Sequence, residues 1–512
     1  MSQNPDSEAR GTSSVLAGTG VPASDPALHE LRPNAIGLLQ STVIAIASSA
    51  PGQATAISLA AIIAASAYGG GAAIIITTIP MLAIAFAYHR LNLWEQNCGA
   101  SYVWVGRAIN PYLGFMVGWI MLVGWILATV SDILPLGPAV LSVFGANPSS
   151  QWGTVISATI LGVGVTIISV LGIQFTARFQ MAIAAIEYAI LLVFSGIAIY
   201  AVFFGRWAGT VHPTLAWLNP SGVGGKGSLV GGALIAVYLF TGWDVAIYLN
   251  EETQRKERNP GLAAIFSVIV LGLFYTLLVV ALQGGAPLSG INANAASAMT
   301  FIAHHLVGSP WDKFMALAIT LSVIGTTQAF LVGTARIAYA MGTDRLLPRQ
   351  FGKVHQVFRT PVFGTVVFGA LTLVMTWLYV FSSSVSGAFD TVVASVGVLF
   401  ALFYAFTGIA TTWYYRALLS RGAGNVLLIG VLPLGGAAAL FYIAVKSILG
   451  FTGASLWSMV GIAILGLAMM TVAAVVYRSP FFLLRRVAYQ PGSDIASSEG
   501  SDDSGSGAVD GA

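Results

Sequence analysis

Residues 36–66 read IGLLQSTVIAIASSAPGQATAISLAAIIAAS, an apolar run of 31 residues. About 20 helical residues cross the hydrocarbon core of a bilayer, so this run is long enough to span a membrane. Proline has no amide hydrogen and glycine adds backbone freedom, so we expect the helix to break in its middle. The residues at this predicted break are Ser48, Ser49, Ala50, Pro51, Gly52 and Gln53.

Eleven further apolar runs follow along the chain. They cover residues 72–89, 108–131, 153–173, 180–204, 229–249, 262–284, 314–341, 362–382, 391–414, 425–446 and 456–478. The strands of a membrane β-barrel are shorter, about 10 residues, and alternate in polarity, whereas these runs are continuously apolar. The sequence therefore predicts an all-α integral membrane protein with about twelve transmembrane helices.

The composition excludes several classes of protein. The 512 residues include only 22 Lys and Arg and 19 Asp and Glu, or 8% charged, and 56% are hydrophobic. Soluble proteins carry about 25% charged residues. We therefore expect most of the protein's surface to contact the lipid bilayer as its partner. A soluble enzyme and a nucleic-acid-binding protein are excluded. The single cysteine, Cys98, excludes a disulfide scaffold and a cysteine metal site, and we expect no cofactor and no metal.

Both ends of the chain differ from this apolar body. Residues 1–34 hold Ser, Pro, Asp and Glu with few large apolar residues, and residues 487–512 are rich in Gly, Ser and Asp. Such compositions are typical of disorder. We expect two disordered cytoplasmic tails on either side of one membrane-spanning domain over residues 35–480.

The basic residues predict the orientation, because cytoplasmic loops carry an excess of Lys and Arg. With a cytoplasmic N-terminus, 18 of the 22 basic residues lie inside and 4 outside. The outside ones are Arg206, Lys226, Lys313 and Lys446. This asymmetry supports an even number of spans with both termini in the cytoplasm, in a plasma membrane such as the bacterial inner membrane.

A second predicted break lies in the run 229–249. Its residues are Phe240, Thr241, Gly242, Trp243 and Asp244. The first and sixth runs each begin a group of five, as in transporters with inverted repeats, where two broken helices form the binding site at the bilayer midplane. Repeat one would cover residues 36–204 and repeat two 229–414, with two added helices over 425–478. The alternative is that the Pro-Gly pair only kinks a helix.

Three segments carry a resemblance to a known family. Residues 231–260 read GGALIAVYLFTGWDVAIYLNEETQRKERNP, residues 99–119 GASYVWVGRAINPYLGFMVGW, and residues 336–355 RIAYAMGTDRLLPRQFGKVH. They resemble, in the right order, the sixth-span signature, the entry to the third span and the segment after the eighth span of the amino acid–polyamine–organocation superfamily. The resemblance extends from about residue 36 to about residue 480.

The resemblance implies a twelve-span permease with a five-plus-five inverted repeat and two added helices. Such permeases move amino acids, amines or polyamines by alternating access, driven by protons, by exchange or by sodium. By position, the substrate contacts fall on residues 48–53, where the family's usual Gly-Ser-Gly type run is replaced, and on residues 240–244. The gating aromatic one turn earlier aligns with Tyr238, and an aromatic of the eighth span aligns with Phe330.

Most other ionisable residues are interpreted as solvated. Asp132 and Asp390 lie at predicted outer ends of spans, and His304 and His305 in a predicted outer loop. The cytoplasmic segment after the sixth span is expected to form a surface network of charges. Its members are Glu251, Glu252, Arg255, Lys256, Glu257 and Arg258.

Two acids, Glu187 and Asp244, lie inside predicted spans, where an ionisable group is costly and is a functional candidate. Asp244 would attract an ammonium, bind a proton, or cap the restarted half-helix. Glu187 occupies the position where many proton-coupled relatives carry a lysine. It would carry a proton, ligate sodium with Ser322, Thr326 or Thr327, bind a cationic substrate, or be a neutral acid bonded to backbone.

The predicted function is a secondary active transporter for amino acids or related amines, working by proton-coupled import. A polyamine importer and a substrate exchanger of the same fold are alternatives. A channel is the alternative from another class, although the sequence shows no repeated filter-like segment. A membrane enzyme would need a cluster of catalytic groups, and we expect no catalytic residue.

Overall fold

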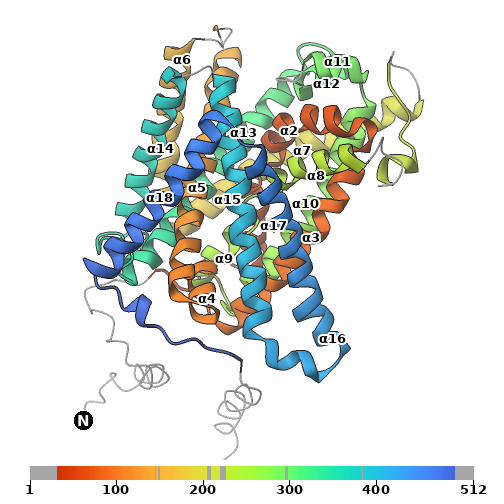
Figure 1. Cartoon of the computed structure of the whole chain (residues 1–512). Helices are drawn as coiled ribbons and strands as arrows, with labels where there is room; N and C mark the ends of the chain where they lie inside the picture. The colour runs from red at the N-terminus through yellow and green to blue at the C-terminus, as the bar shows by residue number, and fades with distance from the viewer. Residues whose placement is uncertain are drawn as a thin grey trace, which may run out of the picture.

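The computed structural model describes residues 31–143, 146–147, 150–204, 209–219, 226–294, 298–382 and 385–489 (Figure 1). Within these ranges the regular structure is helical, apart from one isolated β-bridge between Ile36 and Thr253. The prediction of an all-α protein is confirmed.

The helices follow one another with short connections. The first group comprises α1 (Leu38–Ser48), α2 (Pro51–Ser66), α3 (Gly70–Trp94), α4 (Ser101–Ala108), α5 (Pro111–Val143), α6 (Gln151–Val170) and α7 (Ile173–Phe204). The second comprises α8 (Lys226–Leu239), α9 (Val245–Tyr248), α10 (Asn259–Gly284), α11 (Leu288–Ala293), α12 (Ala298–Val307), α13 (Lys313–Thr343), α14 (Val362–Ser382) and α15 (Val385–Tyr414). The last comprises α16 (Ala423–Asn425), α17 (Leu432–Gly450) and α18 (Gly453–Val475).

The predicted spans correspond to these helices. Among the described residues, ten helices are long and apolar enough to cross a membrane, and a bent pair over Leu38–Ala64 raises the number to eleven. The remaining predicted span, 229–249, contains the short helices α8 and α9. The two predicted spans that are not single continuous helices are thus the two in which breaks were expected.

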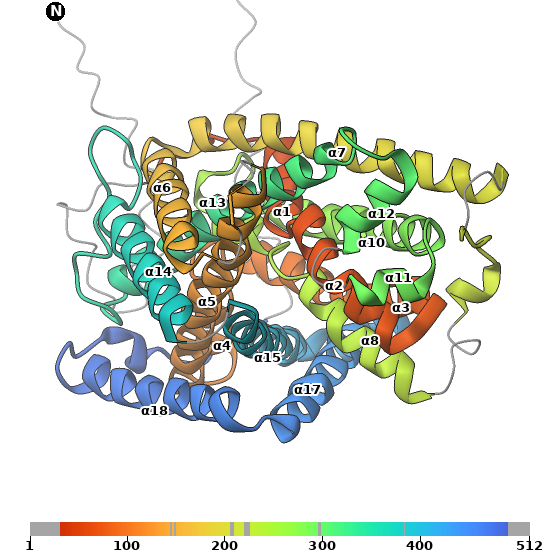
Figure 2. The ribbon, with the colours of Figure 1, turned by 90° about the horizontal axis from the view of Figure 1, so that it is seen from above.

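Helices α1, α5 and α13 lie near the middle of the bundle when it is seen from above (Figure 2). Helix α1 packs against α7, α10 and α13, and α5 packs against α13 and α15. Helices α17 and α18 lie along one edge of the body and α7 along the opposite edge (Figure 2). The break at the end of α1 is therefore surrounded by protein, which is the condition for tolerating an irregular backbone at membrane depth.

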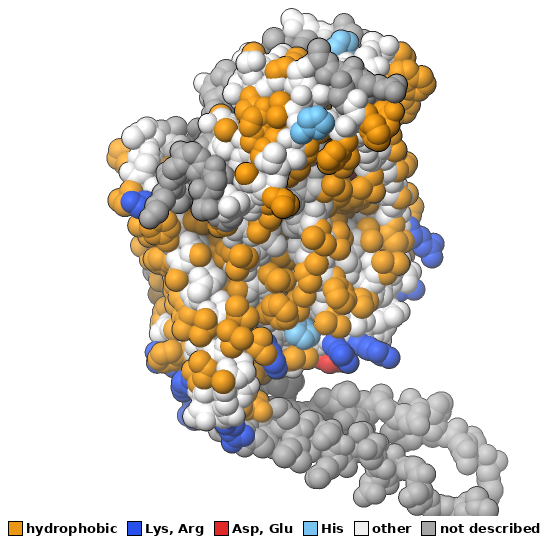
Figure 3. All heavy atoms as spheres, turned by 90° about the vertical axis from the view of Figure 1, so that its right-hand side faces the viewer, with side chains coloured by type: hydrophobic (Ala, Val, Ile, Leu, Met, Phe, Trp, Pro, Cys, Tyr) orange, Lys and Arg blue, Asp and Glu red, His pale blue; other side chains and the backbone are white. Residues whose placement is uncertain are grey.

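The outer surface of the body is apolar. Large side chains such as Trp152 (69% exposed), Leu378 (65%) and Trp457 (72%) project from α6, α14 and α18. Hydrophobic side chains cover the flank seen in Figure 3, and several Lys and Arg side chains lie near its lower end. Water-soluble monomers rarely expose an apolar surface of this extent, and the protein is a multi-pass membrane protein.

The ends of the described chain pack on the body. Leu31 is buried, and the Ala35 amide donates to the Glu252 carbonyl oxygen at 2.8 Å. At the other end, the Val487 amide donates to the Arg107 carbonyl oxygen at 2.9 Å. The rest of both predicted tails lies outside the described residues.

Candidate functional site

The first break separates α1 from α2. Helix α1 ends at Ser48, Ala50 has a left-handed φ of 44°, and Pro51 starts α2. Proline is favourable as the first helical residue because the missing amide hydrogen would have no partner there. The same residue that prevents one continuous helix thus starts the second half.

The second break separates α8 from α9. Helix α8 ends at Leu239, and α9 starts at Val245. Between them Gly242 has a φ of 107°, a conformation that residues with a Cβ rarely adopt. A Cβ at Gly242 would lie 2.3 Å from the Ser48 carbonyl oxygen, so this position requires glycine for both conformation and space.

The two breaks are in direct contact. Ser48 Oγ donates to the Gly242 carbonyl oxygen at 2.6 Å. Other freed carbonyl groups accept from neighbouring helices: Thr326 Oγ1 of α13 donates to Ala47 O at 3.0 Å, and Tyr275 OH of α10 donates to Ser49 O at 2.8 Å. Backbone groups released by the breaks are therefore partly satisfied by hydroxyls inside the body.

A cavity lies at the junction of the breaks. The residues that line it are Ser48, Ser49, Ala50, Gln53, Ala54, Asp132, Tyr238, Thr241, Thr326 and Phe330. Seven of the predicted substrate-binding residues are among them, drawn from the first span, the sixth span and α13. Elements far apart in the sequence thus converge on one small pocket, as expected for the binding site of a carrier.

The other predicted substrate-binding residues do not line this cavity. Pro51 and Gly52 begin α2, Gly242 contacts Ser48, and two aromatics pack elsewhere. The Phe240 ring meets Tyr275 edge to face, with centroids 5.6 Å apart, and Trp243 stacks on Tyr404 at 5.2 Å. Both rings hold the unwound segment against its neighbours.

The prediction that Asp132 lies at a solvated end of a span is wrong. Its side chain is 2% exposed and lines the cavity, because α5 continues through Asp132 to Val143. The predicted third span ends at residue 131, directly before this acid. The signal that could have identified Asp132 is the apolar sequence that resumes directly after it, Ile133-Leu134.

Glu187 joins three helices beside the cavity. It is 2% exposed on α7, and its Oε1 accepts the Gly52 amide at 3.0 Å. The next amide, Gln53 N, donates to Ser322 Oγ of α13 at 3.2 Å. The positive end of the α2 dipole therefore faces a carboxylate of the chain itself.

Asp244 is fully buried, but it does not face the cavity. Its carboxylate accepts from the hydroxyls of Tyr248 and Tyr404, the latter at 2.7 Å. Its side chain makes no capping bond to the start of α9. The capping alternative is wrong, and the contacts tie the second break to α15.

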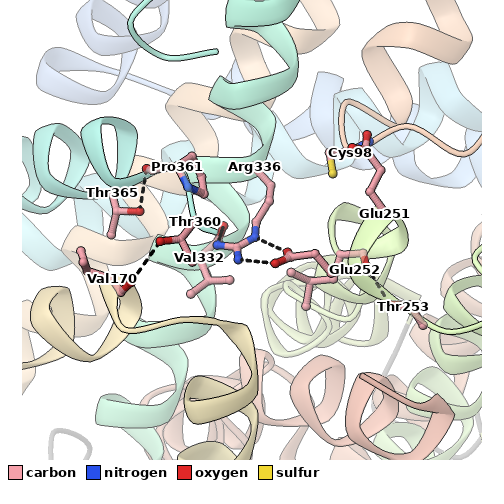
Figure 4. Close-up of polar contacts among 11 residues, drawn as sticks. Cys98, Val170, Glu251, Glu252, Thr253, Val332, Arg336, Thr360, Pro361 and Thr365 are labelled. Carbon is pink, nitrogen blue, oxygen red and sulfur yellow. Dashed lines mark hydrogen bonds and ion pairs between the residues drawn. The ribbon is translucent and has the colours of Figure 1, made fainter. Parts of the chain in front are cut away.

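The predicted network of charges after the sixth span is only partly on the surface. Arg336 and Glu252 form a two-pronged ion pair at 2.8 and 3.1 Å, and both residues are 0% exposed (Figure 4). Nearby, a Glu251 carboxylate oxygen accepts the Cys98 amide at 2.9 Å. The expected surface position is therefore wrong for Glu252, because a buried arginine of α13 pairs with it. Residues 254–258 are exposed, as expected.

Two further ionisable residues singled out in the sequence are His304 and Asp390. His304 is on helix α12 rather than in a loop, and its Nδ1 pairs with Asp312 Oδ2 at 2.8 Å on the surface. The side chain of Asp390 is outside the described part of the chain. Among the described residues, no group of three or more His, Cys, Asp and Glu is arranged to hold a metal ion.

Fold and site define a membrane transporter built around two broken helices, and comparisons with known proteins give its family. The sequence model of the amino acid permease family matches residues 36–445. The chain belongs to this family, within the amino acid–polyamine–organocation superfamily, and is a transporter rather than an enzyme.

Individual relatives are distant in sequence. The chain is 27% identical over 330 residues to the low-affinity putrescine importer PlaP of Escherichia coli (strain K12), covering 64% of this chain and 69% of the relative. It is 22% identical to the branched-chain amino acid permease BcaP of Bacillus subtilis, covering 60% and 67%. A solved structure of a manganese transporter from Eremococcus coleocola matches with a TM-score of 0.56 at 12% identity, covering 86% of this chain and 95% of that one.

Proposed function

We propose that the protein is a secondary active transporter that imports amino acids or related amines across the plasma membrane by alternating access. The observation that carries this proposal is the contact between Ser48 and Gly242, which joins two interrupted helices beside a cavity. Broken helices that meet at a site near the bilayer midplane are typical of carriers in which one group of helices moves against another.

The relatives support small solutes that bear an amine. One is a putrescine importer and another a branched-chain amino acid permease. An ammonium group is common to both substrates, and the lining of this cavity offers an acid, Asp132, and an aromatic ring, Tyr238. A polyamine importer and a substrate exchanger are variants of the same mechanism.

The proposed arrangement in the membrane has five-plus-five inverted repeats, followed by the two added helices α17 and α18. Both termini are in the cytoplasm. This orientation is supported by the 18-to-4 distribution of basic residues. It puts the buried Arg336–Glu252 pair on the cytoplasmic side of the cavity.

Proton coupling is proposed at Glu187. Its carboxylate bonds the start of α2 and lies beside Ser322 of α13, so its charge acts on a contact between two helices. Any motion that separates α2 from α13 changes the solvation of Glu187, and a proton that binds one conformation better shifts the equilibrium between them. Asp244 is the second candidate, although two tyrosine hydroxyls already bond it.

Counterflow in proteoliposomes tests the transport proposal. We expect a labelled solute to enter saturably when vesicles are loaded with the same unlabelled solute, which a channel would not show. If amino acids, monoamines and polyamines all fail to enter while a control permease works, the proposed function is wrong.

Glu187→Gln tests the coupling separately. The amide keeps an oxygen that accepts from Gly52 N but cannot carry a proton, so exchange should persist while accumulation driven by a proton gradient is lost. Uptake by the wild type should fall as external pH rises, and the variant should not respond. Accumulation by Glu187→Gln with the wild-type pH profile would move the coupling to Asp244.

A further inference from the structure

The wall of the cavity contains one carboxylate and no basic side chain among its described lining residues. That carboxylate, Asp132, is 2% exposed, and its Oδ2 has no hydrogen-bond partner in the described part of the chain. The ion pairs of the described residues also leave it out. The polar side chain next to this carboxylate, Gln53, is neutral, so Asp132 has no counter-charge in the described part of the chain. A buried carboxylate without a counter-charge is costly, and the cost falls when a cation comes next to it.

Gln53 adds a second buried polar side chain next to Asp132. It is 2% exposed, and neither Nε2 nor Oε1 has a hydrogen-bond partner within the described residues. The side-chain carbonyl can accept from an ammonium, and the ring of Tyr238 offers a π-face to the same cation. Acceptors suitable for an ammonium therefore gather at Asp132, Gln53 and Tyr238.

The amides at the start of α2 that could bind a substrate carboxylate are, in contrast, already occupied. Half-helix N-termini bind such groups through free amides. At the start of α2, Pro51 has no amide hydrogen, Gly52 N donates to Glu187, and Gln53 N donates to Ser322. The next amide, Ala54 N, donates to the Ala50 carbonyl oxygen at 2.7 Å. A substrate carboxylate would have to displace Glu187 and would meet its like charge.

We propose that the cavity binds an aliphatic amine without a carboxylate group, and that Asp132 receives its ammonium. This inference rests on the proposed transport function, which it narrows to one class of substrate. The chain supplies both carboxylates itself: Glu187 occupies the α2 amides, and Asp132 faces the cavity. A diamine belongs to this class as well. No basic side chain lines the described wall, so none would repel its second ammonium.

Two ligands that differ only by a carboxylate test this assignment. L-Ornithine is 1,4-diaminobutane with a carboxylate on one terminal carbon. Binding of each to the purified full-length chain is measured by thermal shift and by competition against labelled 1,4-diaminobutane. We expect the diamine to bind at least about tenfold more tightly than L-ornithine and than L-alanine, the size of effect given by one charged hydrogen bond.

Asp132→Asn tests the residue. The substitution keeps the shape of the side chain and removes its charge, so affinity for the diamine should fall by about tenfold or more. The matched control is Glu257→Gln, which removes an exposed acid on the segment after the sixth span and should leave affinity unchanged. Size-exclusion elution and tryptophan fluorescence report whether each variant is folded.

Three outcomes would overturn the assignment. They are tighter or equal binding of L-ornithine, wild-type diamine affinity in folded Asp132→Asn, and an equal loss in Glu257→Gln. Should Asp132→Asn fail to fold, the comparison of the two ligands on the wild type still decides. If the diamine binds through Asp132 but shows no counterflow, the binding assignment stands and the transport proposal fails.

Discussion

Tyr238 lies one turn before the second break, where its ring borders the cavity and its hydroxyl is 3.3 Å from Ser131 Oγ. That distance is beyond the usual range for two hydroxyl groups, so the hydroxyl is weakly held. We attribute the contribution of Tyr238 to the ring face, which can close over a bound ammonium.

Replacing this ring should weaken binding. Tyr238→Ala removes the cation–π contact, which is worth roughly 0.5–2 kcal/mol, so the apparent affinity for an amine substrate should fall by the corresponding factor. Tyr238→Phe keeps the ring and should keep most of the affinity. Concentration-dependent uptake by the two variants measures the difference. An equal loss in both would assign the effect to the hydroxyl.

At the scale of elements, the contact between the two breaks depends on glycine. Gly242→Ala would force a Cβ into the Ser48 carbonyl oxygen and hold a non-glycine residue at a left-handed φ. Strain at such a position costs about 1–3 kcal/mol. We expect a lower thermal unfolding temperature in detergent together with loss of transport, because the breaks can no longer meet as they do.

Gly196→Ala is the matched control for this prediction. Gly196 lies on the outer face of α7, and a Cβ there would have no neighbour within 4 Å. Alanine also favours a helix over glycine, so unfolding temperature and transport should be unchanged or slightly raised. Similar losses in the two variants would contradict the explanation by close approach.

The buried ion pair links α13 to the segment after α9. Glu252→Gln would leave Arg336 buried without a counter-charge, and removing one partner of a buried pair costs about 3–5 kcal/mol. The unfolding temperature should fall clearly. Glu95→Gln breaks the partly exposed pair with Arg107, whose side chains are 26% and 27% exposed, and should cost about 1 kcal/mol or less.

At the scale of the whole molecule, orientation is open to a direct test. The native Cys98 is 0% exposed, and burial raises the pKa of its thiol, so it should react little with maleimides. Single cysteines at Trp311 (61% exposed) and Val357 (79% exposed), which lie before the start and beyond the end of α13, then report on opposite ends of that helix. On intact cells, a membrane-impermeant maleimide should label Trp311→Cys but not Val357→Cys, and the reverse result would invert the topology.

The sequence alone determined the class of fold and the two places where helices break. Length and apolarity of the runs require helices in lipid, since a backbone in hydrocarbon must satisfy its own hydrogen bonds. Pro51 and Gly242 act locally, through a missing amide and a missing Cβ, so their effects are readable without any knowledge of packing. For the same reason the sequence predicts seven of the ten residues that line the cavity, because most of these seven flank the two breaks.

Tertiary structure alone decided which charged groups are buried and what they face. Asp132 and Glu252 follow or adjoin polar sequence, and only the packing of α5 against the cavity and of α13 against Glu252 removes them from water. Glu187 was identified as buried, but its bond to Gly52 joins residues 135 positions apart. Burial and partner choice depend on distant segments, because a side chain's environment is set by whatever helix packs beside it rather than by its neighbours in sequence.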